Sequence, residues 1–131
     1  GNPRACAASK ARLLDMLGGN ADVVETGFLS AVEARAAIRT CHLGLSPVPR
    51  HAAGKSGSIA AFISEGLPVA LPFVLEGKDA DEIGFFDLGL RRACITDPDL
   101  KLLTDARAAA QENRSKISVE QVALNFLNSI K

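Results

Sequence analysis

The stretch LGLSPVPRHAAGKSGSIAAFISEGLPVALP, residues 43–72, determines the fold expected for this chain. Leu43–Val48 is a short apolar run closed by two prolines, which is typical of a buried strand that ends at a loop. Ser56–Glu65 carries apolar residues at helical spacing, and Ser56 or Ser58 can cap its first turn. A glycine and a proline end this helix, and Val69–Val74 follows as a second apolar run. The stretch therefore predicts strand, loop, helix and strand, with the two strands parallel and adjacent.

The loop before the predicted helix is rich in cations and small residues. Arg50, His51 and Lys55 all lie in it. The N-terminus of the helix that follows has backbone N–H groups without intrahelical partners, and the helix dipole adds partial positive charge there. Such a concavity suits an anion, most often a phosphate, so we expect an anion site at this loop.

Composition excludes several function classes. The 131 residues suffice for one domain with a single core, and 47% are hydrophobic, as in ordinary globular proteins. The formal net charge is zero, which argues against a large nucleic-acid-binding surface or attachment to an anionic membrane. No apolar run is long enough to span a membrane, and no signal peptide is recognisable.

The cysteines indicate a reducing compartment. Cys6, Cys41 and Cys94 are an odd number and lie in apolar or alanine-rich surroundings. We interpret them as reduced small hydrophobic residues of a cytoplasmic protein rather than as disulfide partners or metal ligands. The chain begins at Gly1 instead of a methionine, which we interpret as the sign of a fragment.

The part of the chain before the central stretch predicts two helices and a strand. Ser9–Leu17 reads as a short helix stopped by two glycines, and Val23–Thr26 as a short strand. Ser30 and Glu33 form a capping box that opens a helix to about Thr40. The residues that this helix is expected to turn toward the core are Val32, Ala36 and Ile38.

After the central stretch, Glu76–Leu90 is loop-like, with one helical turn expected near Asp79–Ile83. Ala93–Thr96 predicts a last strand. Asp97 followed by proline predicts an N-cap for a helix to about Asn113, and a second capping box opens a final amphipathic helix over Val119–Ile130. The acidic residues Asp79, Asp81 and Glu82 lack the spacing of a calcium loop, so we interpret them as a solvated turn and expect no metal site.

This alternation of strands and helices predicts an α/β fold. We expect a single Rossmann-like domain over residues 1–131, a three-layer sandwich with a mostly parallel sheet of about four strands. Ligands of such sheets bind outside the carboxyl ends of the strands, where the loop of Arg50–Lys55 leaves the first strand.

One interpretation of the loop is a P-loop. Gly54, Lys55 and Ser56 match the end of the pattern G-x-x-x-x-G-K-[ST], with a strand before them and a helix after. The opening glycine of that pattern falls on Pro49, which has no N–H to donate, and Val69–Val74 ends without the aspartate that would hold Mg²⁺. A P-loop-like nucleotide-binding domain therefore stays an alternative, as does an α/β interaction module without a ligand.

A second interpretation comes from a family resemblance that covers about a third of the chain. Gly27, Leu29, Ser30 and Glu33 come first, followed by Leu45-Ser46-Pro47 at a strand end and G-x-P-V at Gly66–Val69. In this order they resemble the C-terminal, donor-binding domain of GT-B-fold glycosyltransferases. The resemblance implies transfer of a glycosyl group from a nucleoside diphosphate sugar to an acceptor. It implies no cofactor.

The resemblance also implies a set of site residues. Lys55, Ser56, Gly57 and Ser58 would contact the diphosphate of the nucleotide sugar, and Pro47, Arg50 and His51 would line the same pocket. Many family members carry glutamates where this chain has Ala53 and Ala61, so the ribose contact has no candidate here.

The same resemblance implies parts that this chain lacks. The family's domain begins with one or two further strand–helix units, and its acceptor site involves an N-terminal domain. We therefore expect no activity from this chain alone. Missing central strands would leave an apolar strand edge exposed, and such edges recruit another chain, so we expect a homodimer or a swapped pair of the isolated chain.

Overall fold

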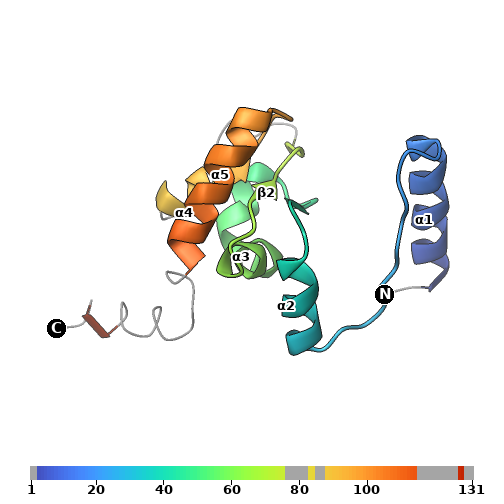
Figure 1. Cartoon of the computed structure of the whole chain (residues 1–131), viewed down its shortest axis with the longest axis horizontal. Helices are drawn as coiled ribbons and strands as arrows, with labels where there is room; N and C mark the ends of the chain where they lie inside the picture. The colour runs from blue at the N-terminus through green and yellow to red at the C-terminus, as the bar shows by residue number, and fades with distance from the viewer. Residues whose placement is uncertain (1–2, 76–82, 85–87, 115–126, 129–131) are drawn as a thin grey trace. The chain divides into compact units, whose positions relative to one another are not determined.

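The computed structural model describes residues 3–75, 83–84, 88–114 and 127–128 (Figure 1). The chain forms two compact units, residues 1–30 and 31–131, and each is described by itself. The assignment of a single domain to residues 1–131 stays a prediction. In the described part of the chain, no helix is long and apolar enough to cross a membrane.

The first unit consists of one helix and an irregular segment. Helix α1 spans Pro3–Leu17 and begins earlier than the predicted Ser9, because proline is well suited to a first helical turn. Gly18 and Gly19 have φ of 56° and 83°, left-handed values that end the helix as expected. The predicted strand at Val23–Thr26 is wrong, since these residues are irregular. An extended segment needs a neighbouring strand for its N–H and C=O groups, and the described residues of this unit provide none.

The second unit contains a small sheet of three parallel strands: β1 (Gly44–Leu45), β2 (Val69–Ala70) and β3 (Cys94–Ile95). Their order in the sheet is β1-β2-β3, and their first residues lie in register. The prediction that the strands flanking the central loop are parallel and adjacent is confirmed. The expected number of about four strands is wrong: the described sheet has three, because the fourth was to be formed by Val23–Thr26.

Both strands of the central stretch are shorter than predicted. Pro47 and Pro49 follow β1 closely, and Pro72 follows β2. At position 72 the N–H would point toward β1, and proline has none, so regular pairing of the two strands cannot continue through this position. Past the carboxyl ends of the strands, the Ser46 N–H still donates to the Ala70 carbonyl at 3.2 Å, and the Leu71 N–H to the Ile95 carbonyl at 2.9 Å.

The helices of this unit include α2 (Ala31–Arg39), the 3₁₀ helix η1 (Arg50–Lys55), α3 (Gly57–Ser64), α4 (Leu88–Arg92) and α5 (Leu100–Asn113). Gly66, with φ of 77°, ends α3 as predicted. The predicted N-cap of α5 is wrong. Asp99, not Asp97, accepts the capping hydrogen bond, from the Leu102 N–H at 3.0 Å.

Helix α2 forms where the capping box predicts it but contributes no buried residue. Val32 is 69% exposed, Ala36 is exposed and Ile38 is half-buried, so the expected core face is wrong. The helix is joined at its C-terminal end, where the Arg39 Nε donates to the Glu65 Oε2 at 2.6 Å. Ala34, Ala37 and Ile38 are half-buried, and the other residues of α2 are exposed.

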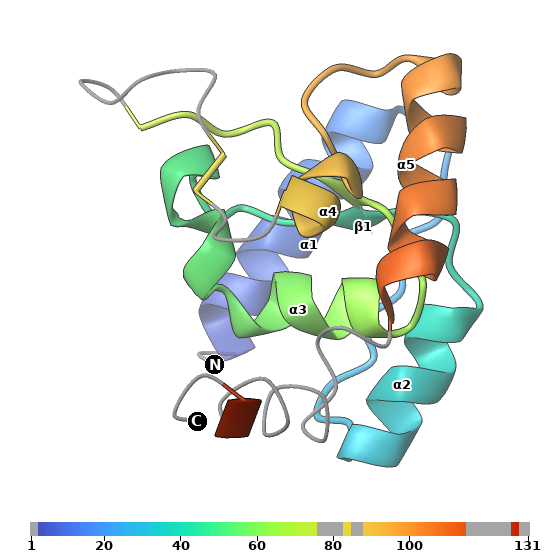
Figure 2. The ribbon, with the colours of Figure 1, turned by 90° about the vertical axis from the view of Figure 1, so that its left-hand side faces the viewer.

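Helices α3 and α5 pack on the face of the sheet that carries Gly44, Val69 and Cys94 (Figure 2). A Cβ on Gly44 would lie 2.6 Å from the Phe62 Cδ2, so glycine allows β1 to pass close to α3. The buried core combines residues of α3 and α5 with residues of η1, of α4, of the sheet and of the segments at its ends: Ala53, Ile59, Ile63, Val69, Leu71, Ile83, Leu90, Ala93, Ala109 and Ala110. This packing fixes the start of α3, which η1 connects to the carboxyl end of β1.

Some predicted features lie outside the described residues. These are the acidic residues Asp79, Asp81 and Glu82 and most of the final helix over Val119–Ile130, of which Leu127 and Asn128 are described and helical.

Candidate anion-binding site

The candidate site begins where β1 leaves the sheet. Ser46 is buried, and its hydroxyl accepts a hydrogen bond from the Val48 N–H at 3.2 Å, which turns the chain. Pro47 is exposed at this turn. After Pro49 the segment that the sequence predicts as a loop forms η1, with Arg50 as its first residue and Lys55 as its last.

Three backbone N–H groups within η1 and directly after it are bonded within the protein. The Ala52 N–H donates to the Pro49 carbonyl at 2.9 Å, and the Ser56 N–H to the Ala53 carbonyl at 3.1 Å. The Gly54 N–H donates to the carbonyl of Gly84 at 2.5 Å. These three donors are therefore not available to a bound anion.

Arg50 points toward the ends of the neighbouring strands. Its Nε donates to the Leu71 carbonyl at 2.8 Å and its Nη2 to the Thr96 carbonyl at 3.3 Å. Both carbonyls belong to residues that directly follow a strand, β2 and β3 respectively. The half-buried guanidinium thus joins η1 to two strand ends.

The N-terminus of α3 follows η1 without a break. Ser56 has the extended backbone of an N-cap, with φ of −88° and ψ of 118°, and its Oγ accepts from the Ile59 N–H at 3.3 Å. The Ser58 Oγ lies 3.0 Å from the Ser56 Oγ. Gly57 is exposed, and a Cβ there would meet open space. By helix geometry, the N–H groups of Gly57 and Ser58 have no acceptor within α3.

The structure brings together four of the predicted site residues: Lys55, Ser56, Gly57 and Ser58 are consecutive at the start of α3, and Lys55 is exposed. Of the three expected to line the pocket, His51 is exposed in the first turn of η1, and Pro47 is exposed before it. The third, Arg50, is turned to the strand ends. Sequence reasoning missed this last arrangement, because the carbonyl acceptors lie 21 and 46 residues away along the chain.

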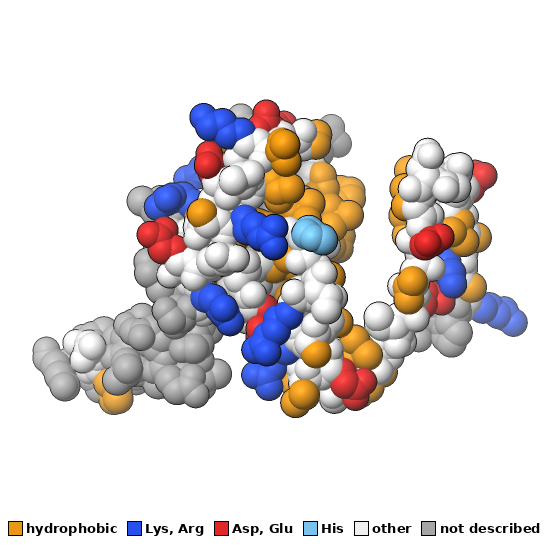
Figure 3. Space-filling view, viewed as in Figure 1, with side chains coloured by type: hydrophobic (Ala, Val, Ile, Leu, Met, Phe, Trp, Pro, Cys, Tyr) orange, Lys and Arg blue, Asp and Glu red, His pale blue; other side chains and the backbone are white. Residues whose placement is uncertain are grey.

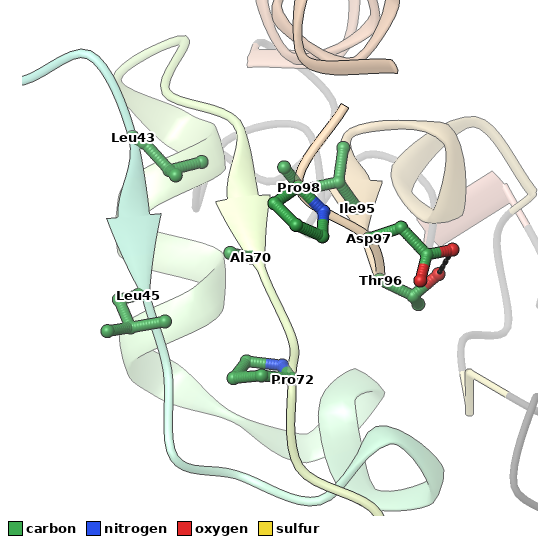
Figure 4. Close-up of a pocket in the computed structure, with 8 residues that line it drawn as sticks. All are labelled: Leu43, Leu45, Ala70, Pro72, Ile95, Thr96, Asp97 and Pro98. Carbon is green, nitrogen blue, oxygen red and sulfur yellow. Dashed lines mark hydrogen bonds between the residues drawn. The ribbon is translucent and has the colours of Figure 1, made fainter. Parts of the chain in front are cut away.

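A cavity of about 270 Å³ lies elsewhere, on the sheet face opposite α3 (Figure 4). It is lined by Leu43, Leu45, Ala70, Pro72, Ile95, Thr96, Asp97 and Pro98. The wall is almost wholly apolar, and exposed hydrophobic side chains gather on this unit in the space-filling view (Figure 3). The alternation of Leu43 and Leu45 around Gly44 is the sequence signal for this apolar face.

Within the described residues, no three His, Cys, Asp or Glu side chains are grouped as metal ligands would be. Burial raises the pKa of the Cys94 thiol to about 12, so this cysteine is protonated at neutral pH and is a poor metal ligand. Its Sγ donates weakly to the Leu90 carbonyl at 3.8 Å.

No family model, curated protein or solved structure matches the chain. Function is therefore inferred from the residues themselves, together with the resemblance carried by Gly27–Val69.

Proposed function

We propose that this chain is the nucleotide-sugar-binding part of a GT-B-fold glycosyltransferase, and that the start of α3 holds the diphosphate. The observation that carries the proposal is the order of the chemical groups at the start of α3. The exposed Lys55 directly precedes the capped, glycine-containing first turn of an α-helix, which starts at the carboxyl end of a parallel sheet.

The contributions of the individual groups differ. The N–H groups of Gly57 and Ser58 and the Ser58 hydroxyl would donate to phosphate oxygens, and Lys55 would add a mobile positive charge. The open space beside Gly57 lets a ligand approach the backbone. Ser56 acts mainly through the cap that holds this turn.

The P-loop alternative is disfavoured by the backbone of η1. A P-loop wraps its amides around the phosphates, whereas the Gly54 and Ser56 N–H groups donate to carbonyls of the protein itself. An interaction module without a ligand stays the second candidate, and the exposed apolar residues Leu43 and Leu45 favour it.

In this proposal, the chain is part of a larger protein. A second layer of helices in that protein covers the other face of the sheet and completes a three-layer Rossmann-like domain, and an N-terminal domain supplies the acceptor site. Glycosyl transfer then requires both domains, and the chain alone binds without turnover. We place the protein in the cytoplasm, where the thiols of Cys41 and Cys94 would stay reduced.

Calorimetric titration of UDP and GDP tests the proposal. Lys55→Ala should weaken binding by roughly ten- to a hundredfold, because a hydrogen bond to a charged group contributes about 1.5–3 kcal/mol. The fold should be unchanged, since Lys55 is exposed. Lys101→Ala removes an equally exposed lysine on α5 and serves as the matched control.

Equal affinities of wild type and Lys55→Ala would remove Lys55 from the site. Absence of binding to wild type, and also to a longer protein that restores the missing strands, would reduce the loop to a structural element.

A further inference from the structure

The guanidinium of Arg50 occupies the position where the sheet ladder ends. The Leu71 N–H still donates to the Ile95 carbonyl at 2.9 Å, as the last bond between the segments of β2 and β3. The Arg50 Nε and Nη2 bridge the carbonyls of Leu71 and Thr96 at this point, through the planar fork that distinguishes arginine from lysine.

The backbone of Arg50 is held as firmly as its side chain. Its N–H donates to the Phe73 carbonyl at 3.2 Å, and its carbonyl accepts from the Gly84 N–H at 3.0 Å. Gly84 also accepts from the Gly54 N–H, so it is bonded to both ends of η1. A Cβ on Gly84 would collide with the His51 carbonyl, which means that only glycine allows this approach. The 3₁₀ helix is therefore clamped between the strand ends and Gly84.

We propose that Arg50 is the positioning residue of the anion site and does not itself contact the phosphates. This inference rests on the proposed function. The fork of Arg50 fixes η1 against β2 and β3, η1 ends at Lys55, and the next residue caps α3. The placement of Lys55 relative to the Gly57 and Ser58 amides is thereby set before a ligand arrives, and such preorganisation lowers the cost of binding.

Two substitutions separate positioning from direct contact. In Arg50→Gln, the Nε2 stands at the same place along the side chain as the arginine Nε and can still donate to the Leu71 carbonyl, but the charge is lost. In Arg50→Lys, the charge is kept and no donor remains at that place. Positioning predicts that Arg50→Gln binds UDP within about threefold of wild type, whereas Arg50→Lys binds UDP about tenfold more weakly than wild type. Direct contact with phosphate predicts the reverse order.

The salt dependence of UDP affinity is the second measurement, because screening weakens interactions between charges. If Arg50 only positions the loop, Arg50→Gln leaves the slope of log Kd against log salt concentration unchanged, while Lys55→Ala reduces it. Circular dichroism confirms that each variant is folded at the titration temperature. If wild type binds UDP and Arg50→Lys binds it with full affinity, this inference is wrong while the proposed function stands. The same holds if wild type binds UDP and Arg50→Gln reduces the slope. Absence of UDP binding to wild type, and also to the longer protein that restores the missing strands, overturns the proposed function and the inference together.

Discussion

Cys94 shows at the scale of one residue how burial changes chemistry. Its side chain lies on the covered face of the sheet against the core, and burial raises its pKa from 9.0 to about 12. Cys41 is exposed at the end of α2. Alkylation requires the thiolate, so the two thiols should differ widely in reactivity.

We predict that iodoacetamide modifies Cys41 and spares Cys94 in the folded protein at pH 8. This pH lies well below the pKa of about 12 that Cys94 has in the folded state. A Cys6→Ser background removes the third thiol, and mass spectrometry of peptides locates the label. Unfolding in guanidinium chloride should expose Cys94 to the reagent. Equal labelling of both cysteines in the folded protein would contradict the burial of Cys94.

The same pKa shift has a consequence for stability. Because the folded pKa lies above the unfolded one, folding favours the protonated thiol. This contribution is complete below pH 9 and is lost as pH rises toward 12. Urea unfolding should therefore show a decline in stability over this range that is smaller in Cys94→Ala.

At the scale of elements, the helices were more predictable than the strands, because helix ends are marked locally. The capping box at Ser30 located α2, and Gly66 located the end of α3. The cap of α5 was misplaced because Asp97 and Asp99 flank the same proline, and only the backbone decides between them. A strand needs a pairing partner that lies far away along the chain. The apolar pattern of Val23–Thr26 predicted a strand, but a local pattern does not show whether such a partner exists.

The candidate site shows the same division. The serines and glycine at the start of α3 follow from a local pattern, so the sequence located them. The acceptors of Arg50 and the approach of Gly84 to His51 are set by tertiary packing, which no spacing within the loop encodes.

The cap of α3 gives a prediction at this scale. Ser56 and Ser58 were equal candidates from sequence, but only the Ser56 Oγ accepts from a backbone N–H in α3, that of Ile59. Ser56→Ala should lower the free energy of unfolding by about 1 kcal/mol. Ser58→Ala is the matched control and should change it by less than about 0.5 kcal/mol. Urea titrations that give the two variants the same loss would contradict the assignment of Ser56 as the cap.

At the scale of the folded unit of residues 31–131, the described helices α3 and α5 pack on one face of the sheet, and no described helix covers Leu45 on the other face. Leu45, on the edge strand β1, is 66% exposed on this face and lines the apolar cavity. The alternation of the strand directs the N–H and C=O of Leu45 away from β2, because Gly44 and Ser46 donate to the β2 side. In the described sheet, the side chain of Leu45 is therefore exposed, and its backbone N–H and C=O point away from the neighbouring strand.

We predict that the chain associates with a second copy at high concentration and that Leu45→Lys reduces this association. A charged side chain on an edge strand is a device by which natural sheets avoid pairing with another chain. The edge is only two residues long, which limits the affinity and makes association dependent on concentration. Multi-angle light scattering over a range of concentrations measures the effect. The free energy of unfolding should change by less than about 0.5 kcal/mol, because an exposed side chain is replaced. Leu100→Lys, which alters a 79% exposed leucine at the start of α5, should leave the mass unchanged. A monomeric mass of wild type at the highest concentration would show that this edge does not recruit a second chain.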